Sequence, residues 1–257
     1  MEPSNSEQRL EGRLLALDTA TSSMTVAVLE NGKLLGERNS LAERNHSIRL
    51  VPAIGELLQS LGMTMKHIDA VAAGKGPGSY TGVRIGVTVA KTFAWTLSIP
   101  LLGISTLETL AYGGFDPALR ERGFTQWVVP ILDARRGQVY TGLYGDNGSG
   151  WVCMKEDGVR KMRDWALELR EMLEKHRNEA PPHRILFVGE VEPFTGVIKI
   201  LALHGKVETA DQPVRAYHAG LLALERWKHG EFEAVHSFNP NYTQLAEAEK
   251  KLLAKQN

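Results

Sequence analysis

LLALD, at residues 14–18, is the stretch that decides the fold, because four apolar residues form a short buried-strand signal that stops at Asp18. The pattern returns at residues 128–133 as VVPILD, which again ends in an aspartate, Asp133. In both places a second strand, an Asn-Gly turn and a third strand follow. The asparagine comes thirteen positions after the aspartate in the first copy (18 to 31) and fourteen positions after it in the second (133 to 147). The sequence therefore predicts one unit that occurs twice.

Further helices and strands continue each copy. The apolar spacing predicts helices over 48–61, 79–97, 164–176 and 217–228, and strands over 70–73, 101–104 and 184–188. Strand triplets followed by alternating helices and strands are typical of α/β domains with mixed sheets. A duplicated unit with an aspartate after the first strand of each copy resembles the actin, Hsp70 and sugar-kinase (ASKHA) fold, in which a nucleotide lies between the halves. We expect a disordered tail at 1–12, a first half at 13–108 joined by a helix near 215–230, and a second, degenerate half at 109–257.

The segment GKGPGSYTGVRIG, residues 74–86, predicts a sharp turn between a strand and a helix. Unpaired amide N–H groups at the start of that helix would attract an anion. The motif is not a P-loop, because its one lysine, Lys75, precedes the turn. It is not the dinucleotide fingerprint either, because Thr81 stands where the third glycine belongs. We expect either something negative or another protein surface at this turn.

A stripe of small residues runs along the helix after the turn. Gly82, Gly86, Ala90 and Ala94 recur every four residues, so they lie on one face. Glycine costs about 1 kcal/mol relative to alanine inside a helix, so close approach of another backbone is expected there. The stripe can pack on the protein's own sheet or on another subunit, and the pattern favours neither.

Composition excludes several classes of protein. Thirty basic residues balance thirty acidic ones, so no global field draws the chain onto nucleic acid. The single cysteine, Cys153, excludes an internal disulfide framework and a multi-cysteine metal cluster, and it fits a reducing compartment. Residues 1–12 carry no apolar core of signal-peptide length, and no run approaches the roughly 18 apolar residues of a membrane span. A cytoplasmic protein without a membrane partner is predicted.

Four motifs together resemble the TsaB (YeaZ) family. They are LALDTAT at 15–21, the glycine-rich run at 74–86, IPLLGISTL at 99–107 and LDARRGQVY at 132–140. A weaker match, PNYTQ at 240–244, lacks the arginine that usually follows the tyrosine. The resemblance implies an accessory subunit of the bacterial machinery that makes threonylcarbamoyladenosine (t6A) at position 37 of tRNAs.

The resemblance also implies a catalytic paralogue, TsaD, which binds a metal and ATP. Its two metal-binding histidines correspond to Thr106 and Leu110 here, and leucine cannot ligate a metal. We therefore expect no catalytic residue, no metal and no required cofactor, with ATP or ADP only at the partner or a shared interface. The residues of a vestigial nucleotide cleft would be Asp18, Gly76, Gly78, Ser79 and Asp133, although turn formation is an alternative role for both aspartates.

The expected partners follow from the same resemblance. It implies a scaffold that pairs with TsaD through the two helices of the first half, self-associates when alone, uses the ATPase TsaE as a third partner and meets tRNA indirectly. The expected interface residues are Ile48, Val51, Thr81, Gly82, Ile85, Gly86, Val89, Ala90 and Ala94.

Two alternatives stay open on the sequence. The first is a phosphotransferase or ATPase of the sugar-kinase type that uses Asp18 and Asp133. The second is direct tRNA binding by the basic runs at 135–136 and 160–163, which otherwise are ordinary solvated charge.

Overall fold

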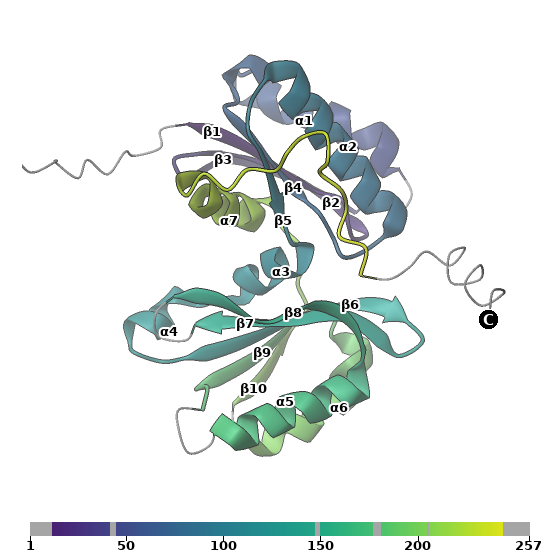
Figure 1. Cartoon of the computed structure of the whole chain (residues 1–257), viewed down its shortest axis with the longest axis vertical. Helices are drawn as coiled ribbons and strands as arrows, with labels where there is room; N and C mark the ends of the chain where they lie inside the picture. Colours follow the sequence, from purple (N-terminus) through teal and green to yellow (C-terminus); the bar gives the residue numbers. More distant parts are fainter. Residues whose placement is uncertain (1–11, 42–44, 147–149, 177–180, 205, 244–257) are drawn as a thin grey trace, which may run out of the picture.

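The chain forms two halves, each built on a five-stranded mixed sheet (Figure 1). This computed structural model describes residues 12–41, 45–146, 150–176, 181–204 and 206–243. The first sheet has the order β3-β2-β1-β4-β5 and the second the order β10-β9-β6-β7-β8. The strands are β1 (Arg13–Asp18), β2 (Ser23–Glu30), β3 (Lys33–Leu41), β4 (Ala70–Gly74), β5 (Leu101–Ile104), β6 (Gln126–Arg135), β7 (Gln138–Asp146), β8 (Trp151–Lys161), β9 (Arg184–Gly189) and β10 (Val207–Ala210).

The two sheets share one pattern of pairing. β1 is antiparallel to β2 and parallel to β4, and β6 is antiparallel to β7 and parallel to β9. Each first strand therefore stands at the centre of its sheet and ends at its aspartate or just beyond it. The predicted duplicated α/β fold is confirmed. The first hairpin turn is also confirmed, since Asn31 and Gly32 have φ of 52° and 83°.

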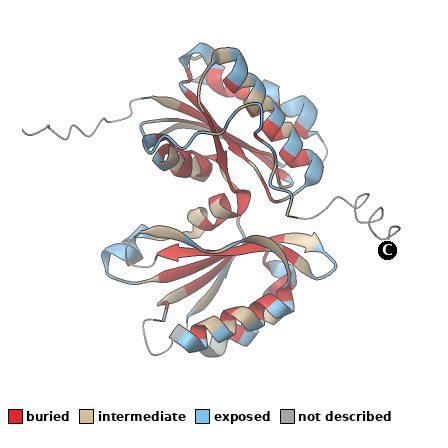
Figure 2. Cartoon of the chain, in the orientation of Figure 1, coloured by how far each residue is buried: buried red, intermediate tan, exposed pale blue. Residues whose placement is uncertain are grey.

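Helices cover both faces of each sheet. The outer face of the first sheet carries α1 (His46–Ser60) and α2 (Tyr80–Leu97), and that of the second carries α5 (Met162–His176), α6 (Thr195–Ile198) and the short helix η3 (Lys199–His204). Between the sheets lie α3 (Thr106–Gly114) and α7 (Ala216–Lys228), while α4 (Pro117–Glu121), η1 (Met65–His67) and η2 (Glu192–Phe194) are short connections. Figure 2 shows the buried residues along both sheets and the inward sides of the helices. No helix in the described ranges is long and apolar enough to cross a membrane.

The two inner helices are exchanged between the halves. α7, near the end of the chain, packs on the first sheet, whereas α3, which follows β5 directly, packs on the second. The apolar spacing did not predict α3 or β10. The predicted Asn147-Gly148 turn and residues 1–11 of the predicted tail lie outside the described residues.

The glycine-rich run folds as a strand-to-helix turn because side chains do not fit there. A Cβ at Gly74 would lie 1.9 Å from Asp18 Oδ2, and one at Gly78 would lie 2.3 Å from the Ala20 carbonyl oxygen. Gly76 has a φ of +87°, which glycine adopts at little cost. Ser79 then caps α2 by accepting a hydrogen bond from the Gly82 amide at 3.3 Å. The run thus brings the start of α2 against the end of β1.

The stripe of small residues packs on the protein's own sheet. The prediction that Gly82, Gly86, Ala90 and Ala94 lie at a subunit interface was therefore wrong. A Cβ at Gly82 would lie 2.1 Å from the Thr19 carbonyl oxygen, and one at Gly86 would lie 2.6 Å from Thr19 Oγ1. Ala90 and Ala94 are 0% and 1% exposed within the first-half core. Their small size lets α2 approach β1, and no partner can reach them without unfolding this face.

Candidate functional site

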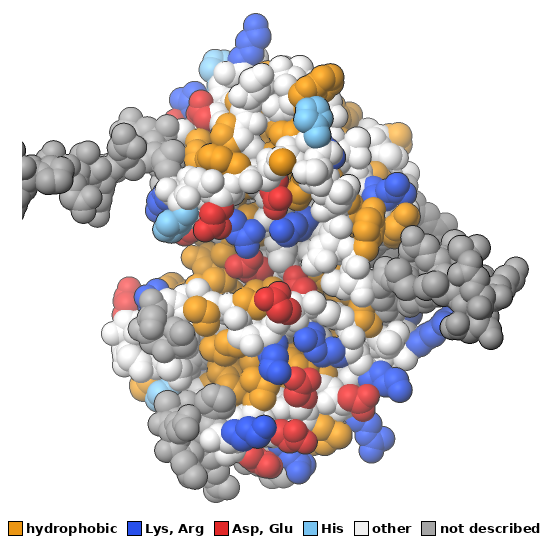
Figure 3. All heavy atoms as spheres, in the orientation of Figure 1, with side chains coloured by type: hydrophobic (Ala, Val, Ile, Leu, Met, Phe, Trp, Pro, Cys, Tyr) orange, Lys and Arg blue, Asp and Glu red, His pale blue; other side chains and the backbone are white. Residues whose placement is uncertain are grey.

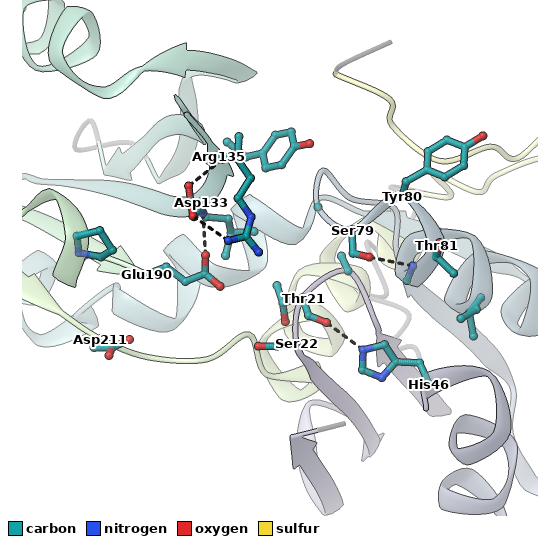
Figure 4. A pocket seen from close by; sticks show the side chains of 18 of the residues that line it. Thr21, Ser22, His46, Ser79, Tyr80, Thr81, Asp133, Arg135, Glu190 and Asp211 are labelled. Carbon is teal, nitrogen blue, oxygen red and sulfur yellow. Dashed lines mark hydrogen bonds and ion pairs between the residues drawn. The ribbon is translucent and has the colours of Figure 1, made fainter. Parts of the chain in front are cut away.

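A cleft of about 970 Å³ lies between the two halves (Figure 4). The first half contributes the turn after β1, with Thr21 and Ser22, and the first residues of α1 and α2. The second half contributes the end of β6, with Asp133 and Arg135, and the segment after β9. The carboxyl ends of the central strands thus face each other across the cleft, which is where open α/β sheets commonly bind ligands.

The first-half wall is formed by two helix N-termini. His46 begins α1 and Tyr80 begins α2. Within these two fully described helices, neither first turn contains an acidic residue. The partial positive charge of each N-terminus is therefore uncompensated by its own helix. His46 is 8% exposed, and its Nε2 lies 3.0 Å from the Thr21 carbonyl oxygen, which ties α1 to the β1–β2 turn.

The charged residues of the second-half wall are acidic except for one arginine. Asp133, Glu190, Glu192 and Asp211 line it together with Arg135. Glu190 Oε2 accepts a hydrogen bond from the Asp133 amide at 2.7 Å, and Asp133 Oδ1 accepts one from the Arg135 amide at 2.8 Å. The two carboxylates thereby fix the turn between β6 and β7. The cleft combines a positive wall with a largely negative one, so it suits a polar ligand.

The structure divides the predicted nucleotide residues into two groups. Gly78, Ser79 and Asp133 line the cleft, and a binding role for them stays a prediction. Asp18 and Gly76 are not among the described lining residues. Asp18 is fully buried; its Oδ1 accepts the Ala20 amide at 2.7 Å and its Oδ2 accepts Thr106 Oγ1 at 2.8 Å. Burial raises the pKa of the Asp18 carboxyl, outweighing these hydrogen bonds.

The raised pKa of Asp18 predicts how stability changes with pH. Protonated Asp18 stabilises the folded state fully below the unfolded pKa of about 3.9, and this contribution is lost as pH rises toward the folded pKa. An asparagine side chain does not titrate in this range. We therefore expect Asp18→Asn to become progressively more stable relative to the unchanged protein as pH rises from about 4 toward neutrality.

Urea unfolding at several pH values in this window measures that difference. The matched control is Asp211→Asn, at an exposed position of the cleft wall. If the stability of Asp18→Asn relative to the unchanged protein stays constant or falls as pH rises, burial does not raise the pKa of Asp18.

The positions that correspond to metal ligands in the paralogue have other uses here. Thr106 is fully buried and bonded to Asp18, and Leu110 packs in the core between α3 and the second sheet. In the described part of the chain, no three His, Cys, Asp or Glu side chains gather in a way that could hold a metal ion.

A buried polar network joins the halves below the cleft, and the sequence did not predict it. Asp157 of β8 accepts hydrogen bonds from Ser105, the cap of α3, and from Tyr144 Oη, the latter at 2.6 Å. Nearby, Arg226 of α7 donates to Glu108 of α3 at 2.7 Å. Burial raises the pKa of both carboxyls. The network connects α3 to an edge strand of one sheet and to the inner helix of the other.

The segment after α7 reaches the glycine-rich turn, a second contact that the sequence did not predict. The Asn241 amide donates to the Lys75 carbonyl at 2.7 Å, and the rings of Tyr242 and Tyr80 are 5.3 Å apart. The PNYTQ motif was the one signal available for it. This segment places an aromatic side chain at the edge of the cleft.

The outer surface of α1 and α2 carries a group of uncharged side chains, which we call the α1–α2 face, beside the exposed charged residues Arg49, Glu56 and Arg84. Ile48 is 68% exposed and Val51 is 49% exposed, while Ile85 and Val89 are half-buried. Along α2, the outward positions also carry three threonines: Thr81, Thr88 and Thr92. The face is defined by these seven uncharged residues, five of which were predicted at an interface.

Comparison with known proteins places the chain among proteins of tRNA modification. The family model of TsaD, described as tRNA N6-adenosine threonylcarbamoyltransferase, matches residues 38–249. The tRNA threonylcarbamoyladenosine biosynthesis protein TsaB of Bacillus subtilis is 37% identical over 246 residues, which cover 95% of this chain and 99% of the relative. TsaB of Escherichia coli is 39% identical over 58% of this chain and 62% of the relative.

Solved structures agree with these relatives. YeaZ from Pseudomonas aeruginosa is 28% identical, with a TM-score of 0.68 over 90% of this chain and 99% of that one. A second P. aeruginosa structure, described as an uncharacterized protein with similarity to peptidase YEAZ, has a TM-score of 0.71 at 28% identity over 91% of this chain and 100% of that one.

Proposed function

Because the chain belongs to the TsaB family, within the wider family that the TsaD model describes, we propose that it is a non-catalytic subunit that pairs with a TsaD paralogue to make t6A at position 37 of tRNAs. Its role is to hold and activate the subunit that transfers the threonylcarbamoyl group. TsaE is the third partner, and the tRNA meets the complex chiefly through TsaD. The proposed setting is the cytoplasm.

The α1–α2 face is the observation that carries the pairing. Interface cores are depleted of charged residues, and the seven uncharged side chains of this face fit such a core, with Arg49, Glu56 and Arg84 at its rim. Ile48 and Val51 are large enough to fill pockets on a partner, and both are presented by a rigid helix. The same face serves for self-association when the partner is missing.

The buried state of Asp18 supports a non-catalytic role. A carboxylate that acts in phosphoryl transfer must reach the metal or the nucleophile in the cleft. Here Asp18 is fully buried and bonded to Thr106, and Leu110 offers no ligand atom. The proposed complex therefore uses ATP or ADP at the partner or at a shared interface, and this chain requires no cofactor of its own.

Reconstitution tests this function directly. The full chain and a TsaD paralogue are co-expressed and analysed by size-exclusion chromatography, and t6A formation on tRNA is then assayed with and without the chain. We expect one heteromeric peak and t6A only when the chain is present. Undiminished t6A formation without the chain contradicts the proposal. So does turnover of Mg-ATP by the chain alone, which would instead support the sugar-kinase type of activity.

A further inference from the structure

The first-half edge of the cleft carries a cation and two neighbouring aromatic rings, whose planes are tilted by 33° to each other. Tyr80 and Tyr242 are each 48% exposed, with ring centroids 5.3 Å apart. The Arg84 guanidinium lies 5.0 Å from the centre of the Tyr80 ring and donates to Tyr80 Oη at 3.2 Å. Together these side chains present exposed aromatic surface beside a positive charge, and aromatic rings and guanidinium groups are the side chains on which nucleobases stack.

The second-half edge carries a basic turn held in a costly conformation. Arg135 and Arg136, between β6 and β7, have φ of 69° and 56°, a region that side chains other than glycine seldom adopt. Such residues persist where their surroundings fix them, and they cluster at functional sites. Here Asp133 and Glu190 fix the turn through the hydrogen bonds described above. The Arg135 side chain is 88% exposed and lies 3.8 Å from Asp133 Oδ2, too far for a strong pair.

Two more cations lie beside this turn. Lys161 pairs in register with Gln138, the first residue after the turn in β7, and Arg163 follows at the start of α5. Both are exposed. Figure 3 shows Lys and Arg side chains at the right-hand edge of the second half, toward which the β6–β7 turn points in Figure 1. Because the whole chain has no net charge, this basic cluster is a local feature rather than part of a general excess.

We propose that single-stranded RNA binds across the mouth of the cleft, with phosphates on the basic turn of the second half and an unstacked base on the Tyr80–Tyr242 surface. The acidic residues of the second-half wall, which are Asp133, Glu190, Glu192 and Asp211, repel phosphate. They therefore keep the RNA backbone at the rim instead of inside the cleft. This contact goes beyond the scaffold role, since it places RNA on the chain itself, and it requires no partner protein.

Fluorescence anisotropy with a labelled single-stranded RNA of about ten nucleotides tests the contact on the isolated full chain. The variant Arg135→Asn with Arg136→Asn removes two charges, and asparagine tolerates positive φ, so the turn is retained. We expect affinity to fall about tenfold or more and the slope of log K against log salt to shrink by about 1.4. Tyr80→Ala should weaken binding about fivefold or more without changing that slope.

The matched control removes two charges from the far side of the second half, by Arg170→Gln with Lys175→Gln on α5. The control should bind RNA like the unchanged protein. If the control loses as much RNA affinity as Arg135→Asn with Arg136→Asn and as Tyr80→Ala, the proposal is overturned. It is also overturned if the unchanged chain does not bind the RNA. Pairing with TsaD is measured separately by chromatography, so failure of RNA binding leaves the proposed function standing, and failure of pairing leaves this contact standing.

Discussion

Replacing Gly82 by alanine should destabilise the protein by roughly 3 kcal/mol, a large effect for one methyl group. The added Cβ would lie 2.1 Å from the Thr19 carbonyl oxygen, which is backbone and cannot rotate away. Either α2 or the β1–β2 turn must then shift, and both line the cleft. Urea unfolding followed by circular dichroism measures the loss.

Gly55→Ala is the matched control, because among the described atoms nothing lies within 4 Å of its added Cβ. Gly55 is exposed in the middle of α1, so alanine should stabilise that helix by up to about 1 kcal/mol. Two identical substitutions in neighbouring helices should thus change stability in opposite directions. Equal effects of the two contradict the close contact of α2 with Thr19.

Replacing Ile85 by aspartate should weaken pairing with TsaD by about 30-fold or more while the chain stays folded. Ile85 is half-buried in the α1–α2 face, beside Val89 and the outward threonines. An unpaired carboxylate at the centre of an interface costs at least about 2 kcal/mol, which raises Kd by about 30-fold or more. Titration of labelled TsaD with the variant measures Kd, and the t6A assay should fall in parallel.

The control for this experiment is Leu167→Asp, which places the same charge on an exposed leucine of α5 in the other half. We expect it to bind TsaD like the unchanged chain. If Ile85→Asp pairs normally, or if Leu167→Asp loses pairing equally, the α1–α2 face is not the interface.

The sequence predicted most of the fold because its strongest signals are local. Apolar runs that end in Asp18 and Asp133, and an Asn-Gly pair after the first of them, predicted the repeated unit and the two sheets. The helix α3 was not predicted. It carries two glycines at its end and is buried by the sheet of the other half, so its apolar pattern is set by contacts distant in sequence.

The site was harder to predict, for a physical reason. A stripe such as Gly82, Gly86, Ala90 and Ala94 indicates close approach but does not say which surface approaches, and here it is β1. Asp18 ends its strand as expected. The hydrogen bond that it accepts from Thr106, 88 residues away in the sequence, was not predicted. The rim formed by Tyr80 and Tyr242 depends on a similarly distant contact. The sequence shows the type of each residue, but it does not show which distant residues contact it in the fold.

The exchange of inner helices has a consequence for how the protein is made. α7 completes the inner face of the first sheet, and its first amide donates to Thr25 Oγ1 at 2.8 Å across 191 residues of sequence. At about 5 to 20 residues per second, a ribosome needs roughly 10 to 40 s to synthesise that interval. During this time the strands of the first half emerge without their covering helix. The apolar inner face of the first sheet is therefore uncovered on the nascent chain until α7 has been synthesised.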